Sequence, residues 1–93
     1  MYYIYILTNK MNTTLYTGVT NDISRRYFEH LEKQSPNSFT AKYNLNKLIY
    51  IESFNKIDDA IRREKQIKGW KREKKMRLIL EINKDLEDLG KYN

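Results

Sequence analysis

Glu64 is the residue whose type and position most favour chemistry. It follows Ile57 by seven residues and Ile61 by three, and it precedes Ile67 by three, so a helical period places its carboxylate on an apolar stripe. Acidic residues are rarely buried without a partner or a metal ion, because an isolated charge is costly to desolvate. Two interpretations stay open: an ion pair or a side chain that snorkels at the edge of the stripe, and a functional carboxylate.

Arg26 and His30 lie four residues apart, so they project from the same side of a second helical stretch. Arginine can pair with a carboxylate such as Glu64, and it can also hold a phosphate through two hydrogen bonds. The simpler alternative is an arginine on an exposed helix face. His30 is the only histidine of the chain, and beside Arg26 it could donate to a phosphate or titrate against one.

Tyr5 and Tyr16 lie in apolar runs typical of strands, where tyrosines commonly fill a core. A free phenol has a pKa of about 10 and is therefore a poor base at neutral pH. Catalysis by either tyrosine would require nearby cations that lower its pKa.

The composition limits the kinds of site that the chain can build. Its 93 residues contain no cysteine, which excludes disulfides and thiolate-bound zinc and leaves oxygen atoms or His30 as metal ligands. The net charge of +6 is concentrated in residues 56–77, which carry +6, whereas residues 1–55 carry +2 and residues 78–93 carry −2. Such a block attracts polyanions, although a solvated helix face would have the same composition.

The chain is long enough for one small domain, and no apolar run is long enough to cross a bilayer. No signal peptide is recognisable, so a soluble, cytoplasmic protein without membrane contact is expected. We predict a single domain over residues 1–82, followed by a polar, acidic and frayed tail over residues 83–93.

The strands and helices that must position these side chains can be predicted from the spacing of apolar residues along the chain. Strand-like runs cover residues 2–7, 14–19 and 48–54. Helical periods cover residues 23–31, 57–67 and 76–82, and the only proline lies in a loop over residues 34–46. The order is β-β-α-β-α-α, which predicts a small α/β sandwich. If Thr8 faces Thr13 across a four-residue hairpin loop, Tyr5 lies opposite Tyr16.

Four segments in this order resemble the GIY-YIG nuclease superfamily: Tyr3-Ile4-Tyr5, Tyr16-Thr17-Gly18, residues 22–26 with His30, and residues 60–70. The chain is similar in particular to small stand-alone bacterial members related to the N-terminal domain of the nuclease component of excinuclease ABC. It departs from the motif at Tyr3, where the family has glycine, and at Thr17, where it has isoleucine. The resemblance implies a three-stranded antiparallel sheet flanked by helices and Mg²⁺-dependent hydrolysis of DNA phosphodiester bonds, with Mn²⁺ as a substitute.

The resemblance also implies roles for single residues. Glu64 corresponds to the metal ligand, Arg26 to the essential arginine and His30 to the frequent helical histidine. Tyr5 and Tyr16 correspond to the two motif tyrosines, and Tyr5 is expected to act as the base once Arg26 and the metal lower its pKa. Gly18 corresponds to the glycine that lets the backbone turn closely into the first helix.

The basic block is expected to hold the phosphate backbone, with two residues of the long loop as further contacts: Arg62, Arg63, Lys65, Lys68, Lys71, Arg72, Lys74 and Lys75, with Lys42 and Tyr43. Such contacts do not read sequence, so we expect cleavage directed by branched or damaged DNA structure, in repair or processing, with a protein partner as one means of targeting. The alternatives are an inert module that binds DNA or, less favoured, RNA, and a protein-interaction domain that uses the Trp70 region.

Overall fold

The computed structural model describes residues 1–31 and 42–92, except for the side chains of residues 30, 31, 91 and 92. Its elements are β1 (Tyr2–Thr8), β2 (Leu15–Thr20), α1 (Ile23–Leu31), β3 (Lys47–Phe54), α3 (Ile57–Lys68), α4 (Arg72–Ile82) and the 3-10 helix η1 (Leu89–Tyr92). The expected order is confirmed, with η1 as an addition. In the described part of the chain, no helix has the length and apolar character needed to cross a membrane.

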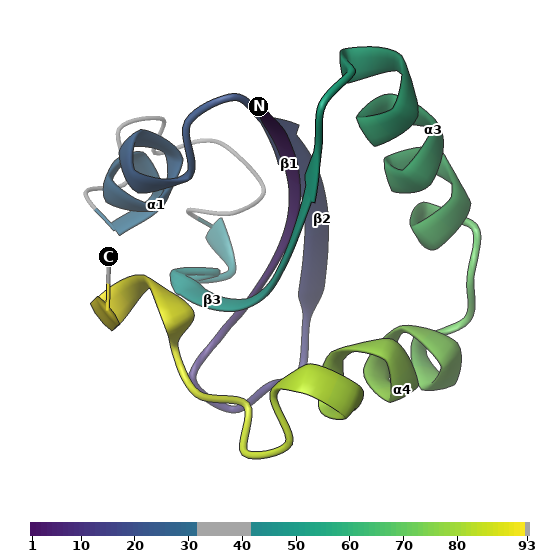
Figure 1. Ribbon diagram of the computed structural model, residues 1–93. Coiled ribbons are helices and arrows are strands. Elements are labelled where there is room, and N and C mark those ends of the chain that lie inside the picture. The colour runs from purple at the N-terminus through teal and green to yellow at the C-terminus, as the bar shows by residue number, and fades with distance from the viewer. Residues whose placement is uncertain (32–41, 93) are drawn as a thin grey trace.

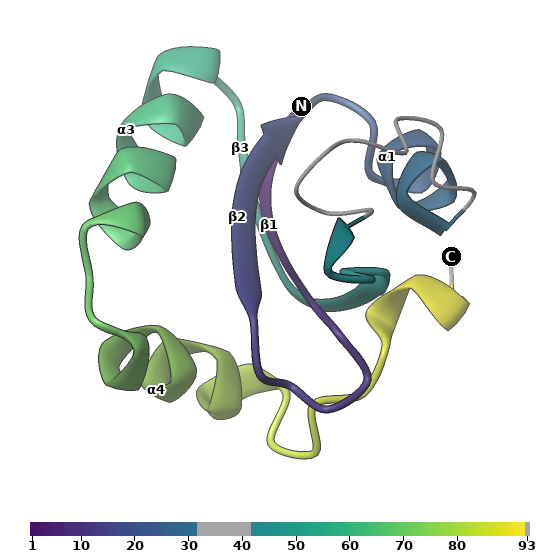
Figure 2. The ribbon, with the colours of Figure 1, turned by 180° about the vertical axis from the view of Figure 1, so that it is seen from behind.

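The three strands form one antiparallel sheet in the order β2-β1-β3, with β1 in the centre. Helices α3 and α4 cover one face, and α1 and η1 cover the other (Figures 1 and 2). The side chains of β1 alternate between two apolar clusters: Ile4 and Ile6 pack towards α3 and α4, whereas Tyr5 and Leu7 pack towards α1. A strand that is covered on both faces needs a sequence without charged residues. The sequence of β1 has none, and it predicted this position.

The register between β1 and β2 differs from the expected one by two residues. Tyr5 pairs with Gly18, and Leu7 pairs with Tyr16. The connection runs over residues 9–14 because Asn9 closes it with its own side chain, whose Oδ1 accepts a hydrogen bond from the Thr13 amide at 2.8 Å. Side chains alternate with a period of two, so a shift of two residues keeps Tyr5 and Tyr16 on the same face.

The expectation of a frayed tail is wrong for residues 83–92. Asn83 is buried, and its Nδ2 donates to the carbonyl of Ile49 in β3 at 3.0 Å and to that of Glu87 at 2.8 Å. Leu89 packs into the apolar cluster beneath α1. The segment is polar because its side chains satisfy backbone groups of the edge strand β3. The domain boundary at residue 82 stays a prediction.

Candidate active site

Tyr5 lies in the centre of the sheet, on the face that α1 covers, and is only 3% exposed. Its ring extends across β2 over Gly18, where a Cβ atom would overlap the Tyr5 ring and hydroxyl. Gly18 belongs to β2 itself and has a negative φ, so its expected role at the turn into α1 is wrong. The residue must be glycine because another side chain occupies the space above it.

Tyr16 is the diagonal neighbour of Tyr5 across β1 and β2. The two ring centroids are 6.3 Å apart, and the ring planes are inclined by 45°. Tyr16 also faces α3, because the Lys68 Nζ lies 6.0 Å from the centroid of its ring. Tyr16 therefore connects the Tyr5 hydroxyl with the helix that carries Glu64.

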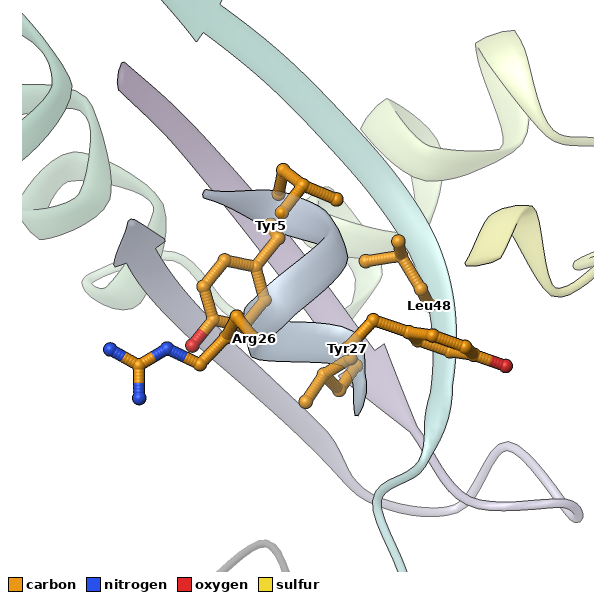
Figure 3. Close-up of a pocket in the computed structure, with 6 residues that line it drawn as sticks. Tyr5, Arg26, Tyr27 and Leu48 are labelled. Carbon is orange, nitrogen blue, oxygen red and sulfur yellow. The ribbon is translucent and has the colours of Figure 1, made fainter. Parts of the chain in front are cut away.

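Arg26 reaches the same area from α1. Its side chain is 40% exposed, and its Nη1 lies 3.4 Å from the Glu29 carboxylate. The Nε atom is buried, and no described group is its hydrogen-bond partner. Figure 3 shows the guanidinium beside the Tyr5 hydroxyl, at the rim of a small depression. The depression is lined by Tyr5, Leu7, Ile23, Arg26, Tyr27 and Leu48.

Glu64 approaches from α3, and its side chain is 16% exposed. Its Oε1 lies 3.3 Å from Lys68 Nζ, so its partner is a lysine on its own helix rather than Arg26. Ile67 is buried on the same stripe, but Ile57 at the start of the helix is 46% exposed. Glu64 thus lies at the edge of the apolar stripe, where its carboxylate keeps contact with solvent.

The environment of Tyr5 raises the pKa of its phenol well above the ordinary value of 10.0. Burial is the main cause, and the neighbouring Tyr16 and Glu64 act in the same direction. Arg26 lowers the pKa but does not reverse the shift. Arg26 alone therefore does not bring the pKa of Tyr5 below its ordinary value, and the combined lowering by Arg26 and a metal ion stays a prediction.

His30 lies on α1 one turn after Arg26, as the period predicts. Its side chain lies outside the described residues, so its proposed role rests on the sequence alone. The other four candidates, Tyr5, Tyr16, Arg26 and Glu64, come from β1, β2, α1 and α3.

The structure divides the basic residues into exposed and internally bonded ones. Arg63 has a side chain that is 25% exposed, with its Nε 3.2 Å from Glu52 and its guanidinium 5.2 Å from the centroid of the Trp70 ring. Arg72 donates to the carbonyls of Asn12 and Thr13 in the β1–β2 turn. These two arginines have partners within the fold, which indicates a structural role, while their contact with phosphate stays a prediction.

The other predicted basic ligands differ in exposure and in their neighbours. Arg62 is 78% exposed beside Asp59, and Lys65 and Lys71 are exposed. Lys74 is exposed over the Trp70 ring, Lys42 lies over Tyr43, and Lys75 is half-buried. Lys68 differs from them because it pairs with Glu64.

Sequence reasoning missed two contacts of this region. Tyr27 donates a hydrogen bond to Asp88, 61 residues later, and Tyr50 donates to Glu52 in a group that includes Arg63. The helical period of Tyr27 indicated its burial, but no local pattern indicated its partner.

The arrangement fits a divalent metal ion that has the Glu64 carboxylate as its one protein ligand. Within the described residues, no group of three or more His, Cys, Asp and Glu side chains could form a cage for a metal. Glu64 offers hard oxygen atoms at a solvent-accessible position, and its present partner Lys68 is half-exposed at the end of a flexible side chain. Mg²⁺ commonly binds through one or two carboxylates and keeps several waters.

Comparison with known proteins gives a family match over most of the chain. The model described as the GIY-YIG catalytic domain matches residues 1–77. The UPF0213 protein SSP2268 of Staphylococcus saprophyticus is 38% identical over 80 residues, which cover 86% of this chain and 95% of that protein. The UPF0213 protein HQ_3675A of Haloquadratum walsbyi is 36% identical, with 86% and 88% covered. These names state no activity.

A solved structure supports the fold. The solution NMR structure of the UPF0213 protein BH0048 from Bacillus halodurans is 29% identical to this chain, with a TM-score of 0.59. The match covers 95% of this chain and 93% of that one.

Proposed function

The chain belongs to the GIY-YIG catalytic domain family, and on that basis we propose that it is a metal-dependent endonuclease that hydrolyses DNA phosphodiester bonds. The observation that carries the proposal is geometric. Tyr5 and Arg26 line one pocket, and the Tyr5 and Tyr16 ring centroids are 6.3 Å apart. Lys68, which pairs with Glu64, lies over the Tyr16 ring. Two phenols, a guanidinium and a carboxylate from four separate elements are an unusual grouping for a purely structural purpose. Binding alone would not require the carboxylate, because it repels phosphate.

Arg26 and Tyr5 bind the scissile phosphate in this proposal. The buried Arg26 Nε is a donor without a described partner, so a phosphate oxygen can accept its hydrogen bond. The Tyr5 phenol, which stays protonated, donates to the phosphate or to the attacking water. Charge that develops on the phosphate oxygens in the transition state is then met by fixed donors, which is commonly the largest contribution to catalysis.

Tyr16 orients the attacking water in this scheme. His30 on α1 accepts the proton of that water, because a neutral imidazole is a base near neutral pH and a phenol is not. Glu64 holds Mg²⁺ or Mn²⁺, which when bound polarises the phosphate and stabilises the leaving 3′ oxygen. Lys68, which now pairs with Glu64, would be free to contact a neighbouring phosphate if Glu64 held a metal ion.

The exposed cations of α3 and α4 grip the DNA backbone: Arg62, Lys65, Lys71 and Lys74. Lys42 and Tyr43, which are exposed in the segment before β3, are further proposed contacts. Backbone contacts position the nucleic acid without reading its sequence. We therefore propose weakly sequence-selective cutting of branched or damaged DNA during repair or processing, with further targeting by a protein partner.

The test is incubation of nicked, flapped and branched DNA with Mg²⁺ or Mn²⁺ and either wild type or Glu64→Ala. Metal-dependent products from wild type alone would support the endonuclease. Binding by both proteins with cutting by neither would instead identify an inert nucleic-acid-binding module. The same binding and cleavage assay with structured RNA shows whether the protein prefers DNA or RNA.

A further inference from the structure

Helix α1 carries Arg26 and, among its described side chains, packs on the sheet through the partly buried Ile23 and Tyr27. It is nine residues long, and no side chain among residues 23–29 is fully buried. Its start is capped by Asp22, whose Oδ1 accepts a hydrogen bond from the Arg25 amide at 3.0 Å. A helix of this length is marginal in water without tertiary contacts. The position of Arg26 therefore depends on whatever fixes α1 to the sheet.

Tyr27, the residue next to Arg26, provides that contact. Its hydroxyl donates to Asp88 Oδ2 at 2.6 Å, and its ring occupies the space above Gly90, where a Cβ atom would overlap it. Figure 3 shows the Tyr27 side chain directed away from the Arg26 guanidinium, on the opposite side of α1. Burial and the hydrogen bond to Asp88 raise the pKa of Tyr27 to about 12, so its hydroxyl stays a donor at neutral pH.

Asp88 joins this contact to the sheet. Its Oδ1 accepts hydrogen bonds from the Leu48 amide of β3 at 3.1 Å and from the Gly90 amide at 3.0 Å. One carboxylate thus connects α1, the edge of β3 and η1, which lies on the same face as α1 in Figures 1 and 2. The carboxylate lies outside residues 1–77, which match the GIY-YIG model.

We propose that Tyr27 and Asp88 are positioning residues that hold Arg26 beside Tyr5, and that residues 83–92 therefore belong to the active-site apparatus. The catalytic part of this inference rests on the proposed function. Loss of the contact leaves Arg26 chemically intact but lets α1 move away from the sheet. The expected consequence is a lower kcat with little change in KM, since phosphate-gripping cations on α3 and α4 are unaffected.

The test compares Tyr27→Phe with Tyr50→Phe, a matched control. Both variants lose a hydroxyl that donates to a carboxylate, but Tyr50 donates to Glu52 on the face covered by α3 and α4. In Tyr27→Phe we expect amide hydrogen exchange of α1 to quicken about tenfold and kcat to fall about tenfold, the usual worth of a hydrogen bond to a charged group. Tyr50→Phe should leave both quantities at the wild-type value.

An NMR signal reports on Arg26 without any need for activity. The Arg26 Nε–H resonance should shift and exchange faster in Tyr27→Phe and stay unchanged in Tyr50→Phe. Equal α1 exchange and equal Nε–H signals in the two variants would overturn the proposal. If the wild type does not cut DNA, the endonuclease assignment fails, while the exchange data still decide whether Tyr27 and Asp88 position Arg26. An asparagine at position 88 can still accept hydrogen bonds from the Leu48 and Gly90 amides through its Oδ1, so Asp88→Asn combined with Tyr27→Phe should add little to the change in α1 exchange.

Discussion

Gly18 and Tyr5 are cross-strand partners, and the Tyr5 ring occupies the space that any Cβ atom at position 18 would need. The backbone of Gly18 has an ordinary negative φ, so its requirement for glycine comes from this ring and not from a special conformation. The absence of a side chain at Gly18 in β2 thus allows the Tyr5 hydroxyl, which we propose to be catalytic, to lie where it does.

Gly18→Ala should therefore displace the Tyr5 ring. We expect a loss of about 1–3 kcal/mol in the free energy of unfolding, as in overpacked cores, and at least a tenfold loss of cleavage rate. Gly69→Ala is the control, because a Cβ atom there lies no closer than 3.5 Å to its neighbours. Urea unfolding and single-turnover cleavage measure the two effects. Equal behaviour of the two variants would contradict the packing argument.

Alkaline pH should destabilise the protein through its buried tyrosines. The pKa values of Tyr5, Tyr27 and Tyr50 are all raised on folding, chiefly by burial. Below pH 10 neither state ionises these groups, but above it the unfolded chain loses protons that the folded chain retains. The free energy of unfolding should fall from about pH 10 upwards, and for Tyr27 the fall should end near its folded pKa of about 12.

Urea unfolding at pH 8, 10 and 11 tests this expectation. Tyr27→Phe should be less stable than wild type at pH 8 but should lose less stability between pH 10 and 11. The same loss in both proteins would show that Tyr27 does not contribute.

Arg72 should affect stability and not the grip on DNA. Its guanidinium donates to two carbonyls of the β1–β2 turn, so Arg72→Gln should cost about 1 kcal/mol of stability and leave the salt dependence of DNA binding unchanged. Lys65→Gln should do the reverse: the slope of log K against log salt should decrease by about 0.9, and stability should stay within about 0.5 kcal/mol. A reduced slope in Arg72→Gln would return Arg72 to the DNA-binding surface.

Removal of divalent metal should stop cleavage without unfolding the protein. The described residues form no cluster of three or more metal-ligating side chains, so we expect no metal that supports the fold. Thermal unfolding with and without EDTA should give the same Tm, while EDTA should abolish product formation. A Tm lowered by several degrees in EDTA would reveal a structural metal.

The sequence predicted most of the fold and the residues that converge, because both depend on local periods. The uncharged run at residues 2–7 indicated a central strand, and helical spacing placed Arg26 and Glu64 on separate helices. The order of the motifs along the chain also resembled the GIY-YIG family, whose model matches residues 1–77.

The sequence could not predict which charged groups find partners inside the protein. Arg63 and Arg72 belong to the same basic run as Lys65, but their acceptors are on β3 and in the β1–β2 turn. Asp88 looked like part of a solvated tail because its partner Tyr27 lies 61 residues away. The direction of the Tyr5 pKa shift likewise depends on burial in the folded protein, which residue types alone do not give.

The central claim is that Glu64 holds a metal ion at a site that cuts DNA, and the most direct measurement is the Mg²⁺ dependence of single-turnover cleavage. Glu64→Gln keeps the shape of the side chain but removes its charge, and Glu81→Gln makes the same change at an exposed position of α4. We predict that Glu64→Gln lowers the cleavage rate by about 100-fold or more with DNA binding retained, and that Glu81→Gln cuts as wild type does. Cleavage by Glu64→Gln at the wild-type rate and with the same Mg²⁺ dependence would contradict the account.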